Sequence, residues 1–346
     1  MSMRETINSW LHGSGPARRL KLAYLRAARE FDRRTVKPAT LNLALQGGGV
    51  LGAFTWGVLD RLSHERALDV KAITGASAGA LNAALFISGF VTGGASGARH
   101  ALKSFWTDIA DASSFSTFMF SPMLMSAQSD MWRQAMTNPG AMSVNPLRSA
   151  LAKNVDIDAL RSAEAPALFV SATHVKTAQA RIFTNADITI DALLASACLP
   201  NLHPTVWIDG EPYWDGGFSA NPALEPLARI DADRTLLVRL IESGAEGLPK
   251  SGAEVDAYMK NLLFNRSLDE ELARLQDDHP QMRDLDVIAL SEYETKVQIS
   301  SRPTPSLIRS LHEKGRAAAE DYLENIRRAA GPGDGEAPQD PVSVTA

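Results

Sequence analysis

The chain has 346 residues, of which 45% are hydrophobic, and it carries a formal net charge of −5 at pH 7. This length is enough for one large α/β domain or two smaller ones with a sizeable core. A single cysteine, Cys198, excludes an internal disulfide and a cysteine-based zinc cluster. The first 40 residues contain no secretory signal, and no stretch has the roughly 18 apolar residues of a spanning helix, so we expect a cytoplasmic location.

The charge is unevenly distributed along the chain. Residues 1–37 contain nine basic and three acidic residues, whereas the rest of the chain contains 26 basic and 37 acidic ones. In this basic leader, leucines and alanines are interleaved with arginines and lysines, which is typical of an amphipathic helix. Such a helix either caps the domain or lies peripherally on an anionic membrane. The acidic body argues against nucleic acid as a partner.

A strand-to-helix turn carries the first candidate catalytic residue. The apolar run Val70–Thr74 predicts a buried strand, Ala80–Ile87 predicts a helix, and Gly75-Ala76-Ser77-Ala78-Gly79 lies between them. A G-x-S-x-G turn in this position is typical of a nucleophile elbow, which exposes the serine beside the N-terminus of the helix. The alternative is a turn of small residues that lets the helix pack closely against the sheet.

A glycine-rich loop precedes this turn. A strand predicted at Leu41–Gln46 runs into Gly47-Gly48-Gly49-Val50-Leu51-Gly52, and a helix is predicted at Ala53–Leu62. The β-α-β-α order predicts a parallel sheet that brings both loops to its carboxyl edge. The loop fits a dinucleotide fingerprint, but the acid at the right distance, Asp69, lies at the beginning of the second strand instead of its end. In the other interpretation, the N–H groups of three glycines form an oxyanion hole.

The remainder of the chain adds a methionine-rich segment, further strands and two long helices. Residues 93–146 start with a flexible glycine-rich stretch, and six of the ten methionines of the chain fall between residues 119 and 142. Methionine side chains adapt to apolar partners, so one interpretation is a lid or a cleft for an acyl chain. The other interpretation is an ordinary helical layer over the sheet. From residue 331 the composition predicts a disordered tail. Strands are predicted at 167–173, 181–184, 236–241 and 286–290, a hairpin at 206–217, and helices at 193–199, 255–275 and 307–326.

A catalytic serine needs a partner that accepts its proton. His279 and His312 have the chain position expected in a Ser-Asp-His triad, but both lie in charged surroundings that predict solvent exposure. His203, which precedes a proline, is more typical of a loop. Asp215 is the better candidate, because flanking aromatic residues would desolvate it and raise its proton affinity. The alternative is that Asp215 and the glycine after it only form a turn.

Four segments in this order resemble the patatin-like phospholipases: Gly47–Gly52, Gly75–Gly79, Ala195–Pro200 and Asp215-Gly216-Gly217. The resemblance covers about residues 41–225 and implies a three-layer α/β/α fold with a mainly parallel central sheet. It also implies hydrolysis of lipid acyl esters by a serine–aspartate dyad without metal or other cofactor. By this similarity Ser77 is the nucleophile, Asp215 is the general base, and Gly47, Gly48 and Gly49 supply the oxyanion hole. Leu51 stands where the family usually has Arg or Lys, so the resemblance leaves the head group open.

The sequence therefore predicts a leader at 1–37, a hydrolase domain at 38–330 and a tail at 331–346. The expected partner is a lipid or another acyl ester, with no nucleic acid. Two hypotheses from other functional classes stay open. One is a nucleotide-binding protein that uses the glycine loop, and the other is a catalytically idle module that binds membranes through the leader.

Overall fold

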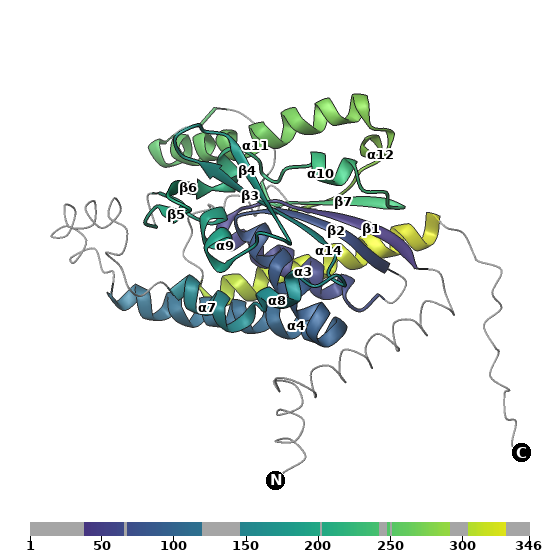
Figure 1. The fold of residues 1–346 in the computed structure, drawn as a ribbon, viewed down its shortest axis with the longest axis horizontal. Coiled ribbons are helices and arrows are strands. Elements are labelled where there is room, and N and C mark those ends of the chain that lie inside the picture. The colour runs from purple at the N-terminus through teal and green to yellow at the C-terminus, as the bar shows by residue number, and fades with distance from the viewer. Residues whose placement is uncertain are drawn as a thin grey trace, which may run out of the picture.

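The computed structural model describes residues 38–65, 68–119, 146–200, 203–241, 248–249, 251–290 and 304–329. Within these residues, eight strands form one mixed sheet with helices on both faces, which is a three-layer α/β/α arrangement (Figure 1). The predicted leader, the predicted tail and residues 120–145 of the methionine-rich segment lie outside the described residues.

The centre of the sheet consists of parallel strands, as the β-α-β-α order predicts. β1 (Ala39–Leu45) pairs in parallel with β2 (Leu68–Ala76) on one side and with β7 (Arg234–Arg239) on the other. The sheet continues in parallel to β3 (Ala167–His174) beyond β2 and to β8 (Asp286–Ala289) beyond β7. The loops that follow β1 and β2 therefore leave the sheet at the same edge.

Three shorter strands add antiparallel pairs around β3. β4 (Ala180–Thr184) pairs with β3, and so does β6 (Glu211–Asp215), which forms a hairpin with β5 (Val206–Ile208). The hairpin predicted at 206–217 is confirmed, although its second strand ends at Asp215, where a 3-10 turn, η2 (Gly216–Phe218), begins.

Helices cover the two faces of the sheet unequally (Figure 1). The thinner layer lies on one face, and the thicker one, which includes the helices that follow the glycine loop and the serine turn, lies on the other. The thinner layer consists of α10 (Glu225–Ala228), α11 (Gly252–Asp278) and α12 (Pro280–Arg283). The thicker layer consists of α3 (Gly52–Leu62), α4 (Ala78–Met119), α7 (Pro146–Asn154), α8 (Ile157–Leu160), α9 (Ile190–Ser196) and α14 (Pro305–Ala329).

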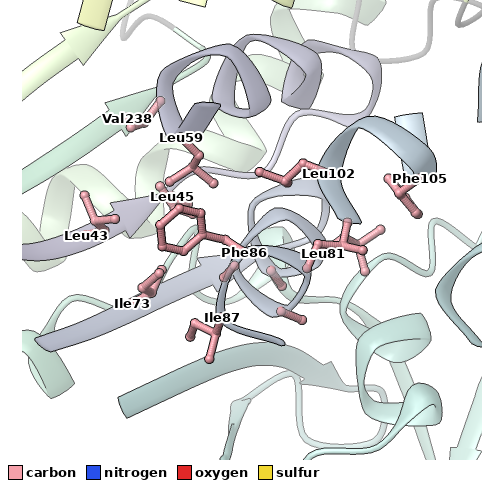
Figure 2. Close-up of a cluster of buried hydrophobic side chains, with 14 of the residues drawn as sticks. Leu43, Leu45, Leu59, Ile73, Leu81, Phe86, Ile87, Leu102, Phe105 and Val238 are labelled. Atoms are coloured by element: carbon pink, nitrogen blue, oxygen red, sulfur yellow. The ribbon is translucent and has the colours of Figure 1, made fainter. Parts of the chain in front are cut away.

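The core follows the two-residue alternation of the strands. Leu43 and Leu45 of β1 and Ile73 of β2 are fully buried toward α3 and α4, in the cluster that Figure 2 shows. Ala44 and Ala72 point to the opposite face and belong to a second cluster with residues of α10, α11 and α12. Large side chains thus fill the thick layer, while small ones let α10 approach the sheet closely.

The segment predicted to begin with a flexible stretch is helical as far as it is described. α4 continues to Met119 but is interrupted at Gly94, where φ is 63° and ψ is −159°. The chain folds back there, because a Cβ added at Gly89 would lie 2.5 Å from Gly97 O. Phe105 and Trp106 are buried at 2% and 4% exposure in the main core. Residues 93–119 therefore form a helical layer, and the lid or cleft hypothesis for the rest of the segment concerns residues outside the described part.

α4 is also long and apolar enough, by composition, to cross a membrane, which the sequence analysis did not foresee. Its residues Ala78–Asp111 pass that test, but 72% of the apolar window is buried inside the protein. The apolar character of α4 is explained by its position in the core.

The last helix, α14, packs directly on α3 at two glycines. A Cβ at Gly57 would overlap the carbonyl oxygen of His312, and a Cβ at Gly315 would overlap that of Phe54. The two helices also share ion pairs, from Arg61 to Glu320 and from Asp60 to Arg316. α14 therefore belongs to the core that supports the glycine loop, because α3 is the helix that follows this loop.

We expect Gly57→Ala to lower the free energy of unfolding by about 1–3 kcal/mol, since the added methyl must push α14 away from α3. Denaturant unfolding followed by circular dichroism measures this loss. Gly93→Ala is the matched control, because a Cβ there meets no atom within 4 Å. Equal stabilities of the two variants would contradict the proposed close contact.

Candidate active site

Ser77 occupies the turn between β2 and α4. β2 ends at Ala76 and α4 begins at Ala78, and Ser77 itself has a φ of 50°, which residues with a side chain rarely adopt. Its carbonyl oxygen accepts a hydrogen bond from Leu81 N at 3.1 Å and so starts α4. Gly79 must lack a side chain, because a Cβ there would overlap Leu45 O of β1. The sharp turn expected from the G-x-S-x-G spacing is present, and such strain is typical of functional positions.

Strand β3 brings Asp215 next to Ser77, although 138 positions separate them in the chain. β3 pairs with β2 up to Ala76, which lies opposite Ser171, and the next residue of β3, Ala172, pairs with Asp215 of β6. The residue after Ala76 and the last residue of β6 therefore meet at the same edge of the sheet. Ser77 Oγ donates a hydrogen bond to Asp215 Oδ2 at 2.7 Å.

The Asp215 carboxyl is fully buried, and each of its oxygens accepts a hydrogen bond. Oδ2 accepts from Ser77, and Oδ1 accepts from Gly217 N at 2.8 Å. Burial raises the pKa of Asp215 from 3.8 to about 7, while these two hydrogen bonds act in the opposite direction. A carboxyl group with this pKa can accept and release a proton near neutral pH.

No histidine of the described residues is hydrogen-bonded to Ser77. His279 lies at the end of α11, and burial lowers the pKa of His203. The predicted solvent exposure of His312 is wrong, because its ring stacks on Trp56 and its Nε2 lies 3.0 Å from Asp60 Oδ2. A long-range contact between α14 and α3 partly buries this ring. In the described part of the chain, no group of three or more His, Cys, Asp or Glu is arranged to hold a metal ion.

The glycine loop lies directly against Ser77. A Cβ added at Gly47 would lie 2.8 Å from Ser77 Cβ. The predicted set of three backbone donors needs a correction, however, because Gly47 N donates to Asn221 Oδ1 at 2.7 Å and is not available to a substrate oxygen. Gly48 and Gly49 begin the short 3-10 helix η1 (Gly49–Leu51), and the first N–H groups of a helix have no acceptor inside it. Two of the three predicted donors therefore stay candidates.

Two buried amides, which the sequence analysis did not single out, fix the glycine loop in place. Gln46 Oε1 accepts from Leu240 N and Ile241 N at 2.7 and 2.9 Å, and Gln46 Nε2 donates to Asn265 of α11. Asn221 Nδ2 donates to the carbonyl of Phe264, also in α11. The position of Gln46 beside the loop was a usable signal, but its partners lie about 200 residues away in the chain.

The end of α9 and the residues that follow it contact both members of the Ser77–Asp215 pair. Ser77 N donates to Ser196 Oγ at 2.9 Å, and Asp215 N donates to Cys198 O at 2.8 Å. Both residues belong to Ala195–Pro200, whose resemblance to the family gave no role for any single residue. Burial raises the pKa of the Cys198 thiol to about 12, so this side chain stays a neutral thiol.

A separate cleft of about 880 Å³ lies on the face of the sheet that carries α10 and α11. Neither Ser77 nor Asp215 lines it, although Ser219 and Ala220 of the chain that follows Asp215 do. Its other walls include Phe169, Ile182, Ile230 and Ser267. The cleft is therefore distinct from the surroundings of the serine hydroxyl.

Fold and site together define a three-layer α/β/α protein with a buried serine–aspartate pair at the carboxyl edge of its sheet. The chain belongs to the patatin-like phospholipase family, whose pattern it matches over residues 43–228, which is 186 of the 346 residues. This family consists of lipid acyl hydrolases, and the chain is assigned to that general class. Comparison with curated protein sequences found no match.

Solved structures with a similar chain path include two bacterial proteins. VipD from Legionella pneumophila has 13% sequence identity and a TM-score of 0.43, with 83% of this chain and 67% of that one covered. ExoU of the Pseudomonas aeruginosa type III secretion system, solved in a heterodimeric complex with SpcU, has 16% identity and a TM-score of 0.38. That match covers 84% of this chain, which spans about half of ExoU (52%).

The raised pKa of Asp215 predicts a pH-dependent stability. Between the ordinary pKa of 3.8 and the folded-state value of about 7, the folded protein binds more protons than the unfolded chain, so stability falls as the pH rises through this window. Asp215→Asn cannot ionise. We therefore expect this variant to gain stability over the natural protein from about pH 5 to about pH 8, by up to a few kcal/mol.

Urea unfolding of Asp215→Asn and of the natural protein, at about pH 5 and at about pH 8, measures this difference in stability. Asp209→Asn is the control, because it changes the same residue type in front of a glycine at an exposed position. A stability difference for Asp215→Asn that is the same at both pH values would contradict the proposed pKa.

Proposed function

We propose that the protein hydrolyses carboxylic esters of lipids through an acyl-enzyme on Ser77, with Asp215 as the general base. The 2.7 Å hydrogen bond from Ser77 Oγ to Asp215 Oδ2 carries this proposal, because it supplies the path for the proton that a serine nucleophile must lose. The match to the patatin-like family over residues 43–228 supports the same reaction class.

In the first half of the proposed reaction, Ser77 Oγ attacks the ester carbonyl carbon and its proton moves to Asp215 Oδ2. The N–H groups of Gly48 and Gly49 stabilise the oxyanion of the tetrahedral intermediate. The intermediate collapses when the C–O bond to the alcohol breaks, and the alcohol leaves with the proton held by Asp215. The acyl group is then an ester of Ser77.

In the second half, water attacks the acyl-enzyme and Asp215 accepts a proton from it. The second tetrahedral intermediate expels Ser77 Oγ, which takes that proton back, and the fatty acid leaves. The same carboxyl group acts as base and acid in turn, and a pKa of about 7 suits both roles near neutral pH. The other oxygen of Asp215 stays on Gly217 N, which holds the carboxyl in one orientation.

The proposal names the acyl ester and not a particular head group. Leu51, which stands where the family usually has a cation, is buried at 1% exposure in the core. The glycine loop therefore offers backbone N–H groups near the reacting atoms but no positive side chain at this position. The cytoplasmic location and a peripheral membrane contact through residues 1–37 stay predictions of the sequence.

The two other hypotheses fit the site less well. Binding of a dinucleotide requires an acid at the carboxyl end of the second strand, whereas Asp69 lies near the amino end of β2 and pairs with Lys71. A buried carboxyl group and a strained serine both lower the stability of the fold. A catalytically idle module would gain nothing that offsets this loss. The acyl hydrolase proposal accounts for both features.

Ser77→Ala should lower kcat on a medium-chain p-nitrophenyl ester by at least about 10³-fold, because the acyl acceptor is lost. Asp215→Asn should lower it by about 10²–10⁴-fold, because Asn accepts no proton. Release of p-nitrophenol by the purified proteins, dispersed with the ester in mixed micelles, measures both. Ser162→Ala, which removes a half-buried hydroxyl that accepts from Glu164 N, away from the Ser77–Asp215 pair, serves as the control for protein preparation. Unchanged turnover by folded Ser77→Ala would exclude the proposed role.

A further inference from the structure

The nucleophile has one backbone group that the regular structure around it leaves unpaired. Ser77 lies between the last residue of β2 and the first residue of α4, so its N–H belongs neither to the sheet nor to the helix ladder. The residue is buried, with an exposure of only 6%. A buried N–H without an acceptor would destabilise the turn, and this N–H finds its acceptor in Ser196 Oγ at 2.9 Å.

Ser196 itself lies in a fixed position. It is fully buried and is the last residue of α9, a helix whose first turn is capped by Thr189 Oγ1. The packing of α9 against β3, β5 and β6 connects the same element to the strand that carries Asp215. The Ser196 hydroxyl is thus held in one position, unlike the hydroxyl of a solvent-exposed serine, which changes rotamer freely.

The same short segment holds the base. Two residues after Ser196, the carbonyl oxygen of Cys198 accepts from Asp215 N at 2.8 Å. The backbone N–H groups of the nucleophile and of the base are therefore both bound by one stretch of three residues, Ser196–Cys198. A shift of this stretch would move the Ser77 backbone relative to Asp215 and lengthen the Oγ to Oδ2 hydrogen bond between them.

We infer that Ser196 is a positioning residue of this site: its hydroxyl fixes the backbone of Ser77 so that Ser77 Oγ stays within hydrogen-bonding distance of Asp215. This inference rests on the proposed function of Ser77 and Asp215. Ser196 touches no substrate and moves no proton, so its effect must appear in the chemical step. Misplacement of a reacting group by about 1 Å can cost about 10²-fold in rate.

The test compares Ser196→Ala with Ser88→Ala by the turnover of a p-nitrophenyl ester. Ser88 is a matched control, because it is also a buried serine of the thick helical layer whose Oγ accepts one backbone N–H, from Asp156 at 2.8 Å, away from the pair. We expect Ser196→Ala to lower kcat about 10- to 100-fold with little change in KM, and Ser88→Ala to leave both unchanged.

A second readout separates positioning from a general loss of stability. The hydrogen bond from Ser77 lowers the pKa of Asp215, so weakening it should move the acid limb of the kcat–pH profile of Ser196→Ala to higher pH. Ser196→Cys nearly preserves the side-chain volume but offers a weak sulfur acceptor, and it should show the same two changes if Ser196→Ala does not fold.

The inference would be overturned if either Ser196 variant folds and has the same kcat as the natural protein, with no shift in the acid limb of its kcat–pH profile. Ser77→Ala, run in the same assay, keeps the two proposals apart. If Ser77→Ala retains turnover, the proposed function fails. If Ser77→Ala is inactive while the Ser196 variants match the natural enzyme, only the positioning role fails.

Discussion

The hydrogen bond from Ser77 Oγ to the buried carboxyl of Asp215 is the interaction on which the site depends. It sets two demands that oppose each other. The carboxyl must be desolvated so that its pKa rises toward neutrality, and it must still have enough donors to be tolerated inside the protein. The donors from Ser77 and Gly217 meet the second demand without supplying a cation that would lower the pKa further. A buried acid held in this way suits proton transfer better than a structural ion pair.

Distant parts of the chain converge to hold this pair. β3 sets the register, because it pairs with β2 and with β6 at successive residues. The segment at the end of α9 binds the backbone of both residues, and α11 accepts from Gln46 and Asn221, the two amides that hold the glycine loop. α14 packs on α3 behind that loop. The site is therefore supported by elements from distant parts of the described chain, which fits the need for reacting groups held at fixed distances.

Sequence patterns predicted the local parts of this arrangement and missed most long-range ones. Strand–loop–helix order and the glycine spacings located Ser77 and the glycine loop, since turn chemistry depends on neighbouring residues. The choice of Asp215 over a histidine followed from its local surroundings, whereas its distance from Ser77 depends on strand register, which no local pattern encodes. Long-range contacts, which no local pattern encodes, also explain why Asn221 binds Gly47 N and why His312 is partly buried. The acceptor role of Ser196 had no signal beyond its place in a segment that resembles the family.

The most direct test of the central claim is to treat the purified protein with a fluorophosphonate probe in mixed micelles and to follow intact and peptide mass. We expect one adduct per chain on Ser77, none in Ser77→Ala, and labelling slowed about 10²-fold in Asp215→Asn, because the hydroxyl has lost its base. Labelling of the natural protein should also slow as the pH falls below about 7, where Asp215 becomes protonated. A folded natural protein that forms no adduct, or an adduct that persists in Ser77→Ala, would contradict the central claim.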